Sequence, residues 1–174
     1  MQALSVPVLE TARLRLRAPS PDDFSDCLAM WTDPDVTRFI GGRASTPEEV
    51  WSRLLTYRGH WATFGFGFWI VESREDGRHM GEVGFADFHR TVEPPVGDVP
   101  EMGWAFRTAT KGEGVASEAV AVALAWRDRS LPGAATRCII NEQNIASRRV
   151  AEKNGFAELC VASYRDAPIL MFER

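Results

Sequence analysis

A glycine-rich segment about two-thirds of the way along the chain could bind an anion. Its sequence, over residues 111–119, is Lys-Gly-Glu-Gly-Val-Ala-Ser-Glu-Ala. The two glycines permit a tight turn that a ligand can approach closely, and the free N–H groups of a following helix favour a negative charge. The pattern lacks the Gly-Lys-Ser/Thr ending of a Walker P-loop and the third glycine of a Rossmann fingerprint. A plain glycine-rich connection between a strand and a helix is the alternative interpretation.

A second segment, residues 141–156, places polar side chains at the start of a helix. Asn141 ends an apolar run, and Asn144 is a residue type that caps helix N-termini. Ser147 lies three residues after Asn144 and therefore projects from the same side of the helix. The segment indicates a polar cluster beside the end of a strand, although it also fits an ordinary capped amphipathic helix.

The elements that position these segments follow from the spacing of apolar residues. Residues 13–17 alternate Arg and Leu with the period of two that is typical of a strand. A helix over residues 24–31 is expected to stop at Pro34, and the capping box at residues 46–49 begins a second helix. Its expected buried stripe consists of Val50, Leu54, Tyr57 and Trp61.

Short strands and helices alternate along the rest of the chain. Strands are predicted at residues 66–72, 80–88, 101–107, 137–140, 156–161 and 168–172, and helices at 115–131 and 144–154. Residues 91–100 are predicted to be a loop, and the apolar run 137–140 a strand buried on both faces. The first of these helices is expected to bury Val115, Ala119, Val122 and Trp126. The order β-α-α-β-β-β-α-β-α-β-β predicts one α/β domain over residues 1–174, with a mixed sheet flanked by helices.

Composition limits the classes of function. The 174 residues are 45% apolar and 25% charged, as in an ordinary soluble globular protein. No apolar run approaches the ~18 residues that span a membrane, and residues 1–5 lack the pattern of a signal peptide. Cys27, Cys138 and Cys160 are expected to be reduced core thiols of a cytoplasmic protein. The net charge of −4 argues against a nucleic-acid partner.

Three motifs together make the chain similar to the GNAT acyltransferase superfamily, and within it to ribosomal-protein N-terminal acetyltransferase-like (RimJ/RimL-type) enzymes. They are the opening Thr-Ala-Arg-Leu-Arg-Leu-Arg of residues 11–17, the glycine turn, and the helix of residues 144–156 with its closing Gly-Phe. Lys111, Gly114 and Ala116 occupy the three specified places of the family pattern Arg/Gln-x-x-Gly-x-Gly/Ala. The resemblance implies a GNAT-like fold whose splayed, mostly antiparallel mixed sheet binds acetyl-CoA between its fourth and fifth strands, with no metal.

The resemblance also assigns residues to acetyl-CoA, the expected co-substrate. Its pyrophosphate is expected on the backbone amides of Gly112, Glu113, Gly114, Val115, Ala116 and Ser117, with the ammonium group of Lys111 near a phosphate. Its pantetheine arm is expected to pair with the backbone near Ala105, Phe106 and Arg107. The second segment is expected to face the cofactor through Asn141, Asn144 and Ser147.

The chemistry that the resemblance implies is attack of an amine on a thioester. Most amines are protonated at neutral pH, so a base or a water relay assists the attack, and a backbone N–H at the end of the fourth strand could stabilise the oxyanion. Glu101, on the strand beside the cofactor, and Glu82, on its neighbour, are the candidate bases. Asp87 and His89 are weaker candidates, and a solvent-facing role is the alternative for each glutamate.

The group that protonates the departing thiolate departs from the family pattern. Many members use a tyrosine on the last long helix, but Val150 and Ala151 occupy that stretch here, and the tyrosines of the chain are Tyr57 and Tyr164. Ser147 is the expected substitute, because its hydroxyl could reach the sulfur. A plain serine in the helix is the alternative.

The acceptor is expected to be a primary amine, either a protein N-terminus or a small molecule. In the family the first two helices wall the acceptor site, and here Trp31, Phe39 and Phe68 are expected to line it. Other residues of this region are Arg38, Gly41, Gly42, Trp61, Phe64 and Phe66, and ordinary core packing is the alternative for the aromatic ones. Two other functions stay open: a non-catalytic acyl-CoA-binding sensor, and a phosphate- or nucleotide-binding enzyme. Homodimers are common in the branch, but no residue pattern indicates one.

Overall fold

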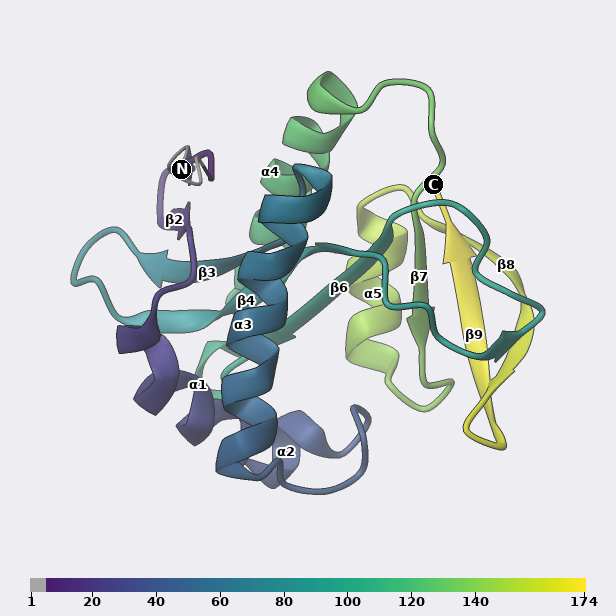
Figure 1. The fold of residues 1–174 in the computed structure, drawn as a ribbon, viewed down its shortest axis with the longest axis horizontal. Coiled ribbons are helices and arrows are strands. Elements are labelled where there is room, and N and C mark those ends of the chain that lie inside the picture. The colour runs from purple at the N-terminus through teal and green to yellow at the C-terminus, as the bar shows by residue number, and fades with distance from the viewer. Residues whose placement is uncertain (1–5) are drawn as a thin grey trace.

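The computed structural model describes residues 6–174, and the segment in which no signal-peptide pattern was found, residues 1–5, lies outside the described residues. One nine-stranded sheet in the order β1-β2-β3-β4-β6-β7-β9-β8-β5 runs through the described residues (Figure 1). The strands are β1 (Leu9–Glu10), β2 (Leu14–Arg17), β3 (Phe68–Ser73), β4 (His79–Ala86), β5 (Val92–Glu93), β6 (Glu101–Phe106), β7 (Arg137–Ile140), β8 (Ala157–Tyr164) and β9 (Ala167–Glu173).

The helices begin and end at the signals expected of them. They are α1 (Phe24–Trp31), α2 (Pro34–Thr37), α3 (Pro47–Phe64), α4 (Val115–Ser130) and α5 (Ile145–Lys153), with 3₁₀ turns at Pro21–Asp23 and Thr108–Thr110. At the start of α3, Thr46 and Glu49 form the predicted capping box. Asn144 caps α5, and Gly155, with φ of +85°, follows its end in the left-handed conformation. No helix within residues 6–174 is long and apolar enough to cross a membrane.

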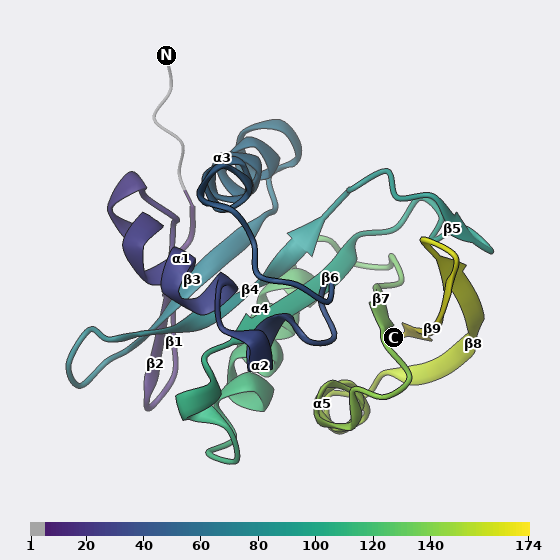
Figure 2. The same cartoon turned by 90° about the horizontal axis from the view of Figure 1, so that it is seen from below.

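The helices cover the two faces of the sheet differently (Figure 2). On one face α1 and α3 pack against Ile70 and Ala105 in a core cluster with Trp31 and Leu54. On the other face α4 packs against a larger core of the central strands, and α5 lies beside α4. The predicted stripe of α3, which comprises Val50, Leu54, Tyr57 and Trp61, is buried throughout.

The sheet divides between β6 and β7. These two strands run parallel, whereas every other neighbouring pair is antiparallel, and they are joined by one residue pair, Glu101 with Arg137. Beyond that pair the strands separate toward Phe106 and Ile140, as Figure 1 shows. With the two-residue strands β1 and β5 set aside, β6 and β7 are the fourth and fifth strands. The expected splayed, mostly antiparallel mixed sheet is therefore confirmed.

Several local predictions were incomplete or wrong. The two-residue strands β1 and β5 were not predicted, and β5 lies within the expected loop of residues 91–100. Pro34 ends α1 but also starts α2, because Asp33 accepts a hydrogen bond from the amide of Asp35 and caps a new helix.

Three burial predictions also need correction. In α4 the buried face includes Val120, Ala123 and Leu124, whereas Val122 and Trp126 are only half-buried. Strand β7 is not buried on both faces: Arg137 and Ile139 are half-buried, and Ile139 lines a cavity. All three cysteines are free, but Cys160 is half-buried rather than in the core.

Candidate active site

The glycine turn leaves backbone amides free at the start of α4. Gly112 and Gly114 have φ values of +84° and +77°, which residues other than glycine rarely adopt. The chain thereby turns directly into the helix at Val115. The amides of Val115, Ala116 and Ser117 have no acceptor within the helix, because the first amide bonded back into the turn is that of Glu118, to the carbonyl of Gly114. The turn is thus a ready binding site for an anion.

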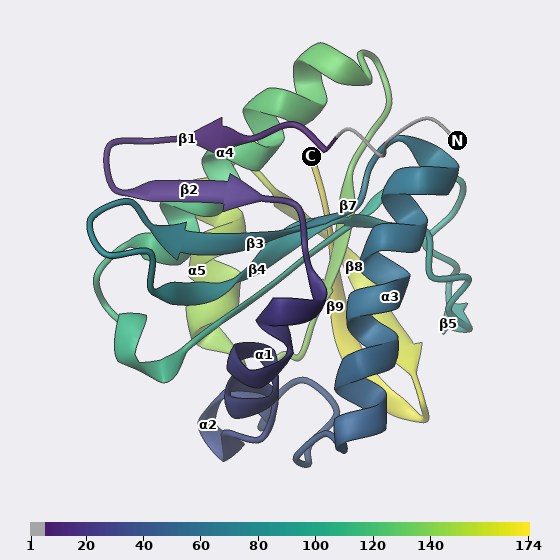
Figure 3. The same ribbon diagram turned by 60° about the vertical axis from the view of Figure 1, so that its left-hand side comes forward.

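A clamp formed by Thr11, Arg13 and Glu118 holds this turn against the N-terminal strands. Glu118 accepts hydrogen bonds from the Arg13 side chain at 2.5 and 2.8 Å and from the Thr11 hydroxyl at 2.5 Å. Arg13 also donates to the carbonyl of Glu113 at 3.0 Å. Figure 3 shows the β1–β2 hairpin beside α4. Although partial burial acts to raise the pKa of Glu118, the bonds from Thr11 and Arg13 lower it, so the carboxylate stays charged but paired.

The gap between β6 and β7 exposes alternate backbone groups of β6. The amide of Arg107 donates to the carbonyl of Met80 at 2.9 Å, so it points toward β4. Because amide directions alternate along a strand, Trp104 and Phe106 direct theirs into the gap, while Ala105 directs its own toward β4. Of the three residues expected to pair with pantetheine, Phe106 therefore has the free backbone groups.

A cavity of about 460 Å³ lies where α1, α3 and the loop after α2 meet this gap. It brings together nine of the residues predicted for the site: Glu82, Glu101, Ala105, Asn141, Asn144, Ser147, Trp31, Phe39 and Phe68. The remaining predicted cofactor residues, Phe106, Arg107, Lys111, Gly112, Glu113, Gly114, Val115, Ala116 and Ser117, lie outside its lining. Asp87 and His89 are exposed and paired with each other at 3.3 Å, also away from it.

Small residues on one face of the sheet create the hollow. Residue partners across an antiparallel pair share a face, and Glu82, Gly84 and Ala86 stand opposite Ala105, Gly103 and Glu101. The two glutamates therefore flank a pair of glycines. The ring of Phe68 lies over Gly103, since a Cβ there would come within 2.9 Å of the ring. A side chain at position 103 would displace that ring.

Glu82 is fully buried and is held by neutral donors. Its Oε2 accepts from the Tyr57 hydroxyl at 2.7 Å, and both of its carboxylate oxygens lie 3.2 Å from the indole N–H of Trp31. Burial raises the pKa of Glu82, and the nearby charge of Arg53 together with these hydrogen bonds offsets only part of that effect. A carboxylate in such surroundings is a stronger base than one in water.

Glu101 is also buried but is paired with a cation. The Nε of Arg90 lies 3.0 Å from both of its oxygens, and the same guanidinium donates to the hydroxyl of Tyr164 at 3.0 Å. Burial raises the pKa of Glu101, against the lowering effect of Arg90. The ion pair fixes Glu101 at the end of the cavity where β6 and β7 meet.

Two polar groups reach the cavity from the start of α5. Asn144 accepts a hydrogen bond from the amide of Ser147 at 3.1 Å through its side-chain oxygen, and it lines the cavity. Ser147 is half-buried and lines the same cavity. The predicted relation of these two residues across one helical turn is therefore present.

Tyr57, Arg53 and Arg90 line the cavity but were not predicted as site residues. Arg53 and Tyr57 lie four residues apart on α3 and so share one face of the helix. An arginine one turn before a tyrosine of the predicted buried stripe is a sequence signal that could have indicated a polar site on this face of α3. Nothing in the sequence pairs Arg90 with Glu101, because their contact depends on the loop that separates them.

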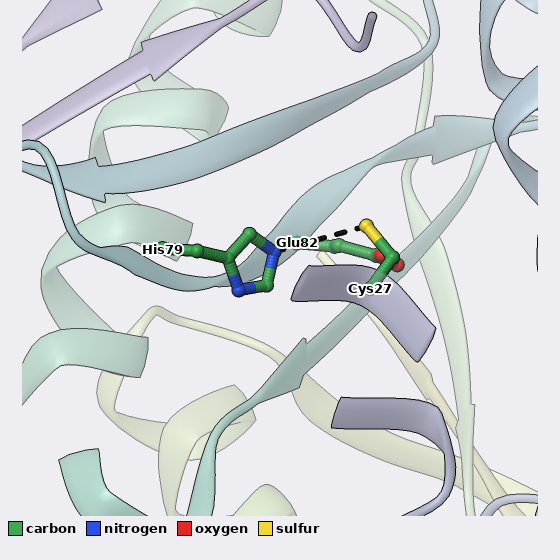
Figure 4. Close-up of side chains that lie close together, drawn as sticks. All are labelled: Cys27, His79 and Glu82. Atoms are coloured by element: carbon green, nitrogen blue, oxygen red, sulfur yellow. Dashed lines mark hydrogen bonds between the residues drawn. The ribbon is translucent and has the colours of Figure 1, made fainter. Parts of the chain in front are cut away.

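Cys27, His79 and Glu82 form a buried cluster beneath the cavity (Figure 4). Arg107 donates from Nε to Nδ1 of His79 at 3.1 Å, so the proton of the neutral imidazole is on Nε2, which faces the sulfur of Cys27 at 3.9 Å. Burial and the charge of Arg107 lower the pKa of His79 to about 4, while burial raises the pKa of the Cys27 thiol.

The hydrogen bonding of this cluster bears on whether it would hold a metal. Metal binding would need a lone pair on Nε2 and a thiolate on Cys27. With this hydrogen bonding, Nε2 of His79 and the sulfur of Cys27 both carry protons. The three side chains therefore form a chain of hydrogen-bond donors and acceptors and not a set of metal ligands. That the protein works without a metal stays a prediction.

Comparisons with known proteins agree with this geometry. Residues 13–157 match the family model described as an acetyltransferase (GNAT) domain. A GNAT-family acetyltransferase of Bordetella pertussis, described as putative, has a structure that superposes with a TM-score of 0.85 and 32% identity, covering 97% of this chain and 99% of that one. The Bacillus subtilis protein YkkB is 28% identical over 170 residues, 95% of this chain and 94% of its own.

The ribosomal-protein enzymes share the fold at lower identity. The structure of RimL, a ribosomal L7/L12 α-N-protein acetyltransferase in complex with coenzyme A, superposes with a TM-score of 0.78 and 13% identity, covering 97% of each chain. At this identity the likeness is one of fold. The family model covers well over half of the chain. The chain therefore belongs to the GNAT family and is an acetyl-CoA-dependent N-acetyltransferase.

Proposed function

We propose that the protein transfers the acetyl group of acetyl-CoA to a primary amine by direct attack within a ternary complex. The observation that carries the proposal is the pair of buried carboxylates, Glu82 on β4 and Glu101 on β6, which share one face of the sheet. They share a cavity with Asn144 and Ser147 at the point where β6 and β7 separate. This arrangement offers a base, a proton donor and free strand amides around one space.

Glu82 serves as the base in this proposal. Its hydrogen bonds come from the neutral groups of Trp31 and Tyr57, whereas the ion pair with Arg90 stabilises the charged form of Glu101 and makes it a weaker base. Of the two candidate bases, Glu82 is therefore preferred, and Glu101 remains the second candidate.

The proposed reaction moves the acetyl group from sulfur to nitrogen and releases one proton. The ammonium group of the acceptor gives one proton to Glu82, directly or through a water molecule, and the free amine attacks the thioester carbon. The new N–C bond forms as the C–S bond breaks, and the amide of Trp104 or Phe106 stabilises the oxyanion. Ser147 protonates the departing thiolate and then takes a proton from the newly acetylated nitrogen, which becomes a neutral amide. The proton that Glu82 took from the ammonium group is released to solvent.

The cofactor turn supports the expected place of the pyrophosphate. Its free amides lie at the positive end of α4, and the clamp from Arg13 neutralises the carboxylate of Glu118 in the first turn of that helix. Pantetheine would extend from this turn along Phe106 and Trp104 into the gap. The acetyl group would then meet the cavity beside Gly103.

The test is acetyl transfer to a panel of peptides and small amines. We expect release of free thiol from acetyl-CoA that depends on the amine, together with a mass increase of one acetyl group in the acceptor. Binding of acetyl-CoA without thiol release with any amine would instead indicate the non-catalytic sensor. Failure to bind coenzyme A at all would leave only the phosphate- or nucleotide-binding interpretation of the turn.

A further inference from the structure

The cavity carries an excess of positive charge, which does not favour the binding of an amine substrate alone. Four arginines line it, namely Arg38, Arg53, Arg90 and Arg165, against the two carboxylates of Glu82 and Glu101. Arg90 is neutralised by Glu101. The others remain beside a single carboxylate, in a chain whose net charge is −4. Since the acceptor amine is itself a cation before it reacts, an acceptor that also carries a negative charge would bind here better than an amine alone.

Arg53 is the most confined of these cations. Its guanidinium stacks on the indole of Trp31, with Cζ 3.8 Å from the ring centroid. Its Nε is buried and has no hydrogen-bond partner within residues 6–174. An unsatisfied buried donor on a charged group is costly. Because the Nε is closed to solvent, a ligand acceptor in the cavity would bond the Nη groups of the same guanidinium instead.

The site of Arg53 adjoins the proposed site of the amine. Arg53 and Tyr57 lie one helical turn apart, a separation of about 5–6 Å between Cβ atoms, and Tyr57 donates to Glu82. The same indole that supports Arg53 donates its N–H to Glu82. Arg38, whose Cζ lies 5.1 Å from the centroid of the Phe39 ring, is an exposed arginine that lines the same cavity.

We propose that the acceptor is an amine that also bears a carboxylate, and that the guanidiniums of Arg53 and Arg38 bind this carboxylate while Glu82 and Tyr57 face the amine. The planar guanidinium matches a carboxylate with two parallel hydrogen bonds. The aromatic walls pack against the few carbon atoms between the two groups. The acceptor is either a small amino acid or a peptide whose first residue is acidic.

This inference rests on the proposed function, and the cofactor offers a competing use for the two arginines. The phosphates of coenzyme A are highly charged, but the turn expected to hold the pyrophosphate does not line the cavity. The experiment therefore measures the kinetics of acceptor and cofactor separately.

The wild-type protein is first assayed with two matched pairs of acceptors. One pair is 4-aminobutyrate and 4-aminobutyramide, and the other is a tetrapeptide amide that begins with aspartate and its counterpart that begins with asparagine. Loss of a charge-assisted hydrogen bond predicts that kcat/KM falls about 10- to 100-fold from the carboxylate to the amide in at least one pair. The pair that shows the effect identifies the source of the carboxylate.

The variants Arg53→Gln and Arg53→Lys then locate the effect. We expect Arg53→Gln to abolish the preference by raising KM for the carboxylate acceptor, with KM for acetyl-CoA unchanged, and Arg53→Lys to keep part of it. Arg43→Gln is the control, because Arg43 is an exposed arginine paired with Glu49 outside the cavity.

Each other outcome overturns the inference. Equal use of carboxylates and amides in both pairs would refute it and leave the proposed function standing. A rise in KM for acetyl-CoA in Arg53→Gln, with the acceptor preference intact, would assign the guanidinium to the cofactor. If no amine is acetylated, the proposed function itself fails.

Discussion

The glycine turn, which we propose binds coenzyme A, and the cavity, which we propose binds the acceptor, are built differently. The turn is a contiguous run of residues, largely exposed, and it offers backbone amides fixed by two glycines with positive φ. The cavity is lined by residues from helices, strands and loops spread between Trp31 and Ile169, and its two carboxylates, Glu82 and Glu101, are buried. If the proposed assignment holds, the turn binds a feature common to all coenzyme A thioesters, and the cavity determines which amine is used.

The largest effect should come from the cavity. We expect Glu82→Gln to lower kcat by about 100- to 10,000-fold with little change in affinity for coenzyme A, because general-base assistance is of this size. In the wild type the rate should rise with pH as Glu82 loses its proton, above the usual range for glutamate since burial raises its pKa. This limb of the kcat–pH profile should be absent in Glu82→Gln.

Glu101→Gln is the matched comparison for Glu82→Gln, and Ser147→Ala tests the proton donor. If Glu101→Gln removes the pH limb and Glu82→Gln does not, the two roles are reversed. Ser147→Ala should matter less with a thioester whose leaving group needs no proton. Retention of kcat within about threefold in all three variants would mean that catalysis is mainly positioning of the substrates.

Changes in the glycine turn should instead weaken the binding of coenzyme A. Valine at position 114 would be strained at φ of +77°, although a Cβ there has room, with Arg13 Nη2 nearest at 3.7 Å. We expect Gly114→Val to weaken coenzyme A binding by about 10- to 100-fold in calorimetry. Gly133→Val, at φ of +84° in the loop after α4, controls for the general cost of a side chain at positive φ. Unchanged affinity in a folded Gly114→Val protein would remove the turn from the cofactor site.

The buried cluster beneath the cavity should make stability depend on pH. His79 has a pKa of about 4 in the folded protein, against about 6.5 in an unfolded chain. Because the folded pKa is depressed, neutral His79 contributes up to about 3 kcal/mol to the free energy of unfolding. This contribution is complete above pH ~6.5 and is lost as the pH falls toward 4.

The control for this prediction is His79→Gln measured by urea unfolding at both ends of that range. Glu82 titrates with the opposite sign, since its raised pKa favours the folded state at low pH, so the difference between wild type and variant isolates His79. A difference that is the same at pH 7 and pH 4 would contradict the assignment of a neutral buried imidazole.

A smaller effect is expected from the exposed rim of the turn. Lys111 is exposed beside the expected pyrophosphate, and a pair of this kind contributes about 1 kcal/mol or less and is screened by salt. Lys111→Ala should therefore weaken coenzyme A binding at low salt and have little effect at high salt. Lys153→Ala, which changes the other lysine of the chain at the end of α5, should have no effect at either.

The contrast between the two regions also explains what could be predicted from the sequence. Gly112, Gly114 and the Asn144 cap act through their own neighbours along the chain, so local patterns reveal them. The bond between Tyr57 and Glu82 requires the register of β4 and the packing of α3 at once, and the contact of Arg107 with His79 and Asp26 joins three distant segments. Short strands such as β5 exist only because β8 is there to pair with them, so no local pattern predicts them.

The clamp of Arg13 on Glu118 has a consequence for how the chain tolerates change. It joins positions 105 residues apart, so the opening motif and the glycine turn are one structural unit, and Arg13→Ala would leave an unneutralised carboxylate beside the expected pyrophosphate. In a double-mutant cycle for coenzyme A affinity, Arg13→Ala and Glu118→Gln should therefore be non-additive, by about 1 kcal/mol or less because Arg13 is half-exposed. Additive losses would show two independent residues. Coupling would mean that positions 13 and 118 can change together at little cost but not separately. Sequence change at the expected cofactor site would then be constrained by the turn between β1 and β2.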